Sequence, residues 1–143
     1  MALAFAASGA VAAEGGLIAI DENPEAYGRV VATGPIAGLQ QKLEAGGAKL
    51  PFADGHGYLG AVLEELKVPL SSQVLVFSKT SLQHPDISPI NPRAIYFNDQ
   101  VYVAWVPGAG LLEVSAFDPV LGAVWYTLDQ ERSDSPRFER NNR

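Results

Sequence analysis

Few side chains in this sequence could carry covalent or metal chemistry. The chain holds two histidines and no cysteine among its 143 residues. His56 stands near Asp54 as a metal pair would, yet no further ligand follows at a recognisable spacing, and the glycines around His56 suit the entry to a helix. His84 precedes Pro85 in a loop-like stretch and forms no known nucleophile pattern with a serine and an acid. We therefore predict no metal site and no catalytic residue.

Other motifs resemble catalytic or phosphate-binding sequences without matching them. Ser78-Lys79 lacks the Ser-x-x-Lys spacing and the Lys-Thr-Gly partner of the serine/lysine hydrolases. Gly55-His56-Gly57 matches neither the dinucleotide nor the P-loop spacing, and Gly108-Ala109-Gly110 suits a hairpin between two predicted strands. The lack of cysteine also excludes disulfides, thiolate nucleophiles and Cys-based zinc, iron–sulfur or covalent haem sites within these residues. We predict a protein that is not an enzyme and holds no cofactor.

A small-ligand site is the alternative hypothesis. Lys79, Arg93, Tyr96 and Asp99 could line a pocket between helices and sheet, with Lys79, Arg93 and Asp99 as ligand-binding groups. In the other interpretation, Arg93 and Asp99 hold the ends of loops and strands by hydrogen bonds. A deep pocket that contains Arg93 and Lys79 would favour the first interpretation, and a closed core would favour the second.

Size and charge narrow the possible partners. A chain of 143 residues, 48% hydrophobic and 18% charged, has the composition of one globular domain. At this length, folding buries about 68% of the extended-chain surface. Ten basic against sixteen acidic residues give a net charge of −6, which argues against binding to nucleic acid or anionic lipid through charge. We predict a single domain whose partners are proteins.

Two short helices are marked by their boundaries. Gly34-Pro35 predicts the start of the first, because proline is favoured at the first helical position, and Gly46-Gly47 predicts its end. The second is expected to follow residues 54–57 and to stop before Val68-Pro69, since a residue before proline avoids the helical region. Helices this short are marginal alone and need a sheet to cover their apolar faces.

Five β-rich stretches predict the sheet. Residues 74–77 read as a short buried strand, and turn-forming residues separate four further strands, expected over residues 94–98, 101–106, 111–117 and 123–128. Between the first two, residues 78–93 form a long excursion with three prolines. The predicted fold is α+β, with two short helices packed on a mainly antiparallel five-stranded meander sheet.

Aromatic side chains occur throughout this predicted sheet, Phe117 and Tyr126 among them. Because successive residues of a strand face opposite sides, one face should meet the helices and the other could expose an apolar patch. We predict partner-binding residues in the sheet and just after it, namely Tyr96, Trp105, Trp125, Arg137 and Phe138.

The two ends have a different character from the middle. Residues 1–13 carry no charge and read as a signal-like apolar segment, with the natural start upstream, or as an N-terminal arm. Residues 17–31 are expected to form an extended arm. Residues 14–130 would be the single domain, and residues 131–143 a polar C-terminal tail without periodicity.

Several ordered motifs then resemble a family of uncharacterised exported bacterial proteins, over about Leu39 to Phe138. They are Gly55-His56-Gly57-Tyr58-Leu59, residues 72–81, Asn91-Pro92-Arg93-Ala94-Ile95-Tyr96-Phe97-Asn98-Asp99, Val101-Tyr102-Val103, Tyr126-Thr127-Leu128-Asp129-Gln130 and Pro136-Arg137-Phe138. In that family the module precedes a c-type haem site with the pattern Cys-x-x-Cys-His, which implies periplasmic electron transfer. No cysteine is present here, so redox activity is not implied. Either this version lost the haem domain or the sequence stops before it.

The resemblance therefore implies a haem-free module. We expect an extracytoplasmic accessory or scaffold subunit that docks on a membrane electron-transfer assembly, for example a photosynthetic reaction centre or a respiratory complex. Its partners would be protein subunits, with membrane contact indirect or through the N-terminal apolar segment. The alternatives are a periplasmic ligand-binding or enzymatic domain, or the haem-free fragment of a cytochrome c-type protein.

Overall fold

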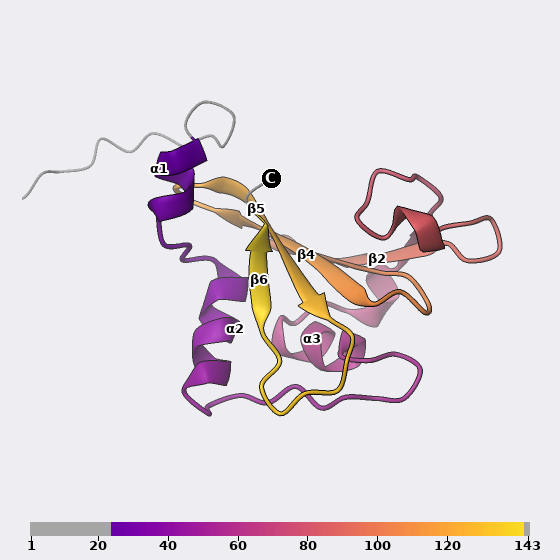
Figure 1. Cartoon of the computed structure of the whole chain (residues 1–143), viewed down its shortest axis with the longest axis horizontal. Coiled ribbons are helices and arrows are strands. Elements are labelled where there is room, and N and C mark those ends of the chain that lie inside the picture. Colours follow the sequence, from indigo (N-terminus) through magenta and orange to yellow (C-terminus); the bar gives the residue numbers. More distant parts are fainter. Residues whose placement is uncertain (1–23, 142–143) are drawn as a thin grey trace, which may run out of the picture.

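A computed structural model describes residues 24–141, which form one antiparallel sheet and three helices (Figure 1). Six strands lie side by side in sequence order. They are β1 (Val74–Val76), β2 (Arg93–Phe97), β3 (Val101–Trp105), β4 (Leu111–Asp118), β5 (Gly122–Asp129) and β6 (Phe138–Asn141). The α+β meander is confirmed, and the prediction of five strands is corrected to six.

Two helices begin and end where the sequence predicted them. Helix α2 spans Pro35–Glu44, with proline at its first position, and glycine Gly46 follows it at a φ of 72°. Helix α3 spans Leu59–Glu65 and ends before Val68-Pro69. Both present apolar side chains to the sheet. The resulting core includes Ile36, Leu39, Leu59, Val62, Leu63, Val103, Leu112, Val114 and Leu128.

A third helix, α1, corrects the prediction of an extended arm. It spans Pro24–Arg29 and buries Tyr27. Six residues are too few for a stable helix alone, and the Arg140 guanidinium holds this one by donating to the carbonyls of Tyr27 (2.9 Å), Gly28 (3.1 Å) and Val30 (2.7 Å). These hydrogen bonds join residues about 110 positions apart in the sequence, so no local sequence pattern predicts the helix. Residues 17–23 of the predicted arm and the signal-like segment lie outside the described residues.

Strand β6 corrects the prediction of a polar tail. Its residues pair with β5, with Phe138 opposite Leu128 and Glu139 opposite Thr127. Phe138 is buried, and its backbone N–H donates to Gln40 Oε1 of α2 at 2.8 Å. In Figure 1, β6 accordingly runs beside α2. The strand is short and rich in charged residues, so tertiary contacts rather than β-propensity form it.

Strand β1 is at the edge of the sheet and is not buried. It pairs with β2 alone, and its Val74 and Leu75 side chains are 45% and 53% exposed. The apolar run 74–77 predicted a strand correctly, but the pattern of an apolar run does not distinguish a central strand from an edge strand. Beyond β1, the excursion carries one short 3-10 turn, η2 (His84–Asp86).

The sheet has two unlike faces. The inner face packs on α2 and α3, and it carries Tyr96, Val103, Val114 and Tyr126. The outer face carries the residues between them in each strand. Four of its aromatic side chains, Phe97, Tyr102, Phe117 and Trp125, are between 38% and 61% exposed. The predicted exposed apolar face is therefore present.

Candidate binding surfaces

The predicted partner-binding residues separate into three environments. Trp125 lies exposed on the outer face, and Arg137 is exposed in the segment before β6. Trp105 is half-buried against the core, where its ring stacks on His56 with centroids 5.2 Å apart. Tyr96 and Phe138 are buried, so the prediction that they contact a partner is corrected: both are core residues. The hydroxyl of Tyr96 accepts a hydrogen bond from Gln73 Nε2 at 2.5 Å.

Sequence reasoning missed Phe97 and Tyr102 as exposed surface residues. Strand register makes them direct neighbours across the β2–β3 hairpin, and their rings stack with centroids 5.9 Å apart. Alternation within each strand could assign them to one face. Only the register places them in the same cross-strand row as Trp125, because register depends on where each hairpin turns.

The proposed ligand-binding residues do not share a pocket. Arg93 begins β2 on the outer face, whereas Tyr96 faces the core and Asp99 lies beyond the other end of the strand. The two ends of β2, Arg93 and Phe97, lie about 13 Å apart. Because Asp99 lies beyond the Phe97 end, Arg93 and Asp99 cannot contact one ligand group together. Lys79 is exposed in the excursion. The geometry favours a structural role for Arg93, which donates to the Thr80 carbonyl at 3.4 Å, whereas no such contact is seen for Asp99 among residues 24–141.

Arg93 instead belongs to a polar network that fastens the excursion to the sheet. The Glu113 carboxylate of β4 accepts hydrogen bonds from the Ser81 hydroxyl, from Leu82 N at 3.0 Å and from Gln83 Nε2 at 3.1 Å. Arg93 lies 3.7 Å from the same carboxylate. Gln83 is almost fully buried and also donates to the Ala104 carbonyl at 3.3 Å. Glu113 is thus occupied as an anchor.

Replacing this anchor should release the excursion. In Glu113→Ala, the amides of Leu82 and Gln83 should exchange hydrogen about 10- to 100-fold faster, because hydrogen bonds to a charged group stabilise by about 1.5–3 kcal/mol. Hydrogen-exchange mass spectrometry measures this directly. Thr127→Ala, opposite Glu113 on the same face, is the matched control and should leave those amides unchanged. Equal exchange in wild type and Glu113→Ala would contradict the anchoring role.

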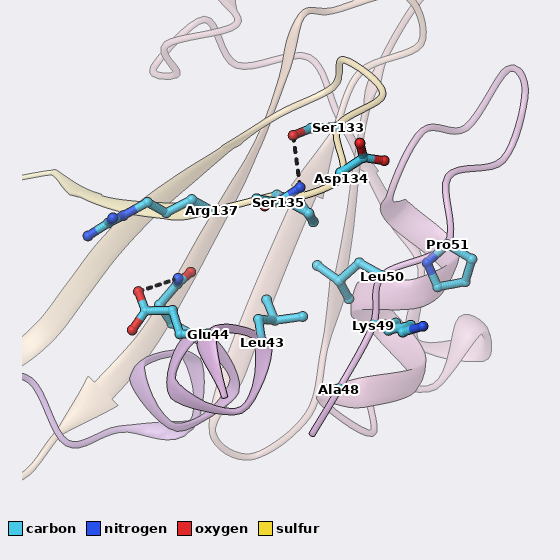
Figure 2. Close-up of a pocket in the computed structure, with 12 residues that line it drawn as sticks. Leu43, Glu44, Ala48, Lys49, Leu50, Pro51, Ser133, Asp134, Ser135 and Arg137 are labelled. Atoms are coloured by element: carbon cyan, nitrogen blue, oxygen red, sulfur yellow. Dashed lines mark hydrogen bonds between the residues drawn. The ribbon is translucent and has the colours of Figure 1, made fainter. Parts of the chain in front are cut away.

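A further groove lies between α2 and the segment before β6 (Figure 2). Its volume is about 860 Å³. Leu43 and Leu50 contribute its apolar part, and Figure 2 shows Arg137 extending away from them. The Glu44 carboxylate on its rim already accepts from Gln40 Nε2 at 2.8 Å. Its lining contains no histidine, and its ionisable side chains are Glu44, Lys49, Asp134 and Arg137.

Further observations bear on chemistry. Within residues 24–141, no group of three or more histidine, aspartate or glutamate side chains could hold a metal ion. In the same part of the chain, no helix is long and apolar enough to cross a bilayer.

Burial raises the pKa of Tyr126, and the positive charge of Arg140 partly opposes this increase. This tyrosine is a core residue of β5, so its shifted pKa reflects packing.

Comparison with known proteins assigns no relative. The chain matches no family model, no curated protein and no solved structure. What it does must therefore be argued from its own surface.

Proposed function

We propose that this chain is a non-catalytic docking module that binds a partner protein through the outer face of its sheet. The observation that carries the proposal is the set of exposed aromatic side chains on that face, Phe97, Tyr102, Phe117 and Trp125. Single exposed apolar residues are ordinary on protein surfaces. A gathered aromatic set is typical of an interaction site, because aromatic rings contribute much of the binding energy at interfaces.

The arrangement of polar groups supports docking rather than turnover. Glu113 and Arg93 interact with each other and hold the excursion. The carboxylate of Asp118, which has a shifted pKa, is buried in the β4–β5 turn. In both arrangements the carboxylate already accepts several hydrogen bonds from the protein, whereas the aromatic face is open to a large partner.

The finer proposal concerns where the module works. Its resemblance to exported proteins that carry a c-type haem supports an extracytoplasmic accessory subunit of a membrane electron-transfer assembly, such as a photosynthetic reaction centre or a respiratory complex. A subunit of this kind needs adhesive surface and no cofactor of its own. The partner would be a protein subunit of that assembly that faces the same compartment.

Co-purification from membranes of the native host tests this proposal. Wild-type protein should fractionate with a membrane complex, and Trp125→Ser/Phe117→Ser should shift to the free pool, since losing two aromatic anchors at an interface costs several kcal/mol. Leu70→Ser is the matched control, because Leu70 is exposed in the short turn η1 (Leu70–Ser72), outside the strands that carry the four aromatic side chains. Wild-type protein found only free, or a double variant that stays bound, would contradict the proposal.

A further inference from the structure

The outer face holds a defined groove within the aromatic surface. Strand register aligns Phe97, Tyr102, Ser115 and Trp125 in one row across β2, β3, β4 and β5. Tyr102 and Trp125 are separated by two strand spacings, about 10 Å, with the small Ser115 between them. The two rings and Ser115 border a cavity of about 280 Å³, and Ala104 continues its floor. The row therefore presents two aromatic walls on either side of a shallow floor.

Most polar groups that border this groove are occupied by the protein itself, and one exception is Arg93 Nε, which is buried and has no hydrogen-bond partner among residues 24–141. Glu113 accepts hydrogen bonds from Ser81, Leu82 and Gln83, and it pairs with Arg93. A glycan or a nucleotide needs several free charged or planar polar groups around each ring, and this network leaves few. The groove therefore favours a ligand that is recognised by apolar contact with a small number of hydrogen bonds.

Three donors remain along the aromatic row. The Tyr102 hydroxyl, the Ser115 hydroxyl and the Trp125 indole N–H have no hydrogen-bond partner among residues 24–141. A polyproline II segment matches this arrangement, since its carbonyls are unpaired, its prolines form apolar ridges, and its backbone is already extended before binding. Aromatic-lined grooves recognise such segments for these reasons.

We propose that the groove between Tyr102 and Trp125 binds a proline-rich extended segment of the partner protein. This inference rests on the proposed docking function and names the chemistry of the docked segment. A proline of the segment sits between the two aromatic rings over Ser115, and neighbouring carbonyls accept hydrogen bonds from the free donors. The preformed conformation of the segment lowers the entropy lost on binding.

Titration of the full ¹⁵N-labelled chain with an acetylated decaproline peptide tests the proposal by NMR. Shifts should be confined to the amides of residues 102–104, 113–116 and 124–126 and to the Trp125 indole. Trp125→Ala should weaken binding about 30-fold, as expected for an aromatic anchor worth about 2 kcal/mol. Leu70→Ala should bind like wild type, and a Gly-Ser peptide of equal length should cause no shifts.

Two results would overturn the inference. One is the absence of shifts in the groove with decaproline at millimolar concentration. The other is shifts there with cellohexaose but not with decaproline, which would assign the groove to a glycan. The docking function is tested separately: if decaproline fails while Trp125→Ser/Phe117→Ser still releases the chain from its membrane complex, docking stands and the proline-rich class is wrong.

Discussion

Replacing Asp118 with asparagine should lower the free energy of unfolding by about 3–5 kcal/mol, the largest effect expected for an isosteric change in this protein. The buried carboxylate accepts four hydrogen bonds. One oxygen takes Thr33 N at 2.7 Å and Thr33 Oγ1 at 3.3 Å, and the other takes Val120 N at 2.8 Å and Leu121 N at 3.0 Å. An amide nitrogen in place of either oxygen would face two donors. Denaturant unfolding monitored by circular dichroism measures the loss.

The same carboxylate should make the protein sensitive to acid. Burial raises the pKa of Asp118, but the hydrogen bonds from Thr33, Leu121 and Val120 outweigh it and hold the pKa below the ordinary 3.8. A lowered pKa in the folded state stabilises the protein above the unfolded-state pKa. This stabilisation is lost as the pH falls from about 4 through the folded-state pKa. Wild-type stability should therefore fall more steeply than that of Asp118→Asn in this range.

Asp134→Asn provides the control for both experiments. Asp134 is an exposed aspartate in the segment before β6, so its replacement changes the net charge equally without touching a buried hydrogen bond. It should leave the free energy of unfolding within about 0.5 kcal/mol of wild type. Equal stability of Asp118→Asn and Asp134→Asn would show that the four hydrogen bonds contribute nothing net.

Replacing Gly57 with alanine should lower the free energy of unfolding by about 2–3 kcal/mol. Gly57 has a φ of 58°, which alanine adopts at a cost of about 1–2 kcal/mol. A Cβ there would lie 1.7 Å from Gln130 Oε1, the atom that accepts Tyr58 N at 2.9 Å just before α3. The variant would therefore lose that hydrogen bond as well, worth about 1 kcal/mol. Thermal and denaturant unfolding measure the sum.

Gly55→Ala separates the two contributions. Gly55 also has a positive φ, 82°, but a Cβ there meets nothing within 4 Å. Gly55→Ala should therefore lower the free energy of unfolding through backbone strain alone. The difference in stability between the two variants then isolates the contact with Gln130. In a Gln130→Ala background that difference should vanish. A persistent difference would mean that the Gln130 contact does not explain the cost.

Local patterns predicted most of the elements. Pro35 and the glycines after α2 marked that helix because they act on the backbone next to them. The four strands β2 to β5 followed from alternation and turn residues for the same reason. Helix α1 and strand β6 escaped prediction because each depends on contacts across the whole chain, through Arg140 and Gln40. Sequence spacing carries no signal of such contacts.

The candidate surface was predictable only in part. Alternation predicted an exposed aromatic face, and the structure shows Trp125 exposed on that face. It could not assign Tyr96 to the core, because both faces of a strand look alike until helices cover one of them. The ordered motifs proved to have structural partners: Gly57-Tyr58 meets Gln130, and Phe138 meets Gln40. These residues therefore stabilise the fold through contacts between distant segments of the chain.

Site-specific photocrosslinking in the native host tests the central claim most directly. A crosslinking amino acid in place of Ala123, which is exposed on the outer face opposite Phe117, should form a covalent adduct with one partner protein. The same group in place of Glu64, which is exposed on α3, should form none. Adducts from position 64 alone, or equal adducts from both positions, would contradict docking through the outer face of the sheet.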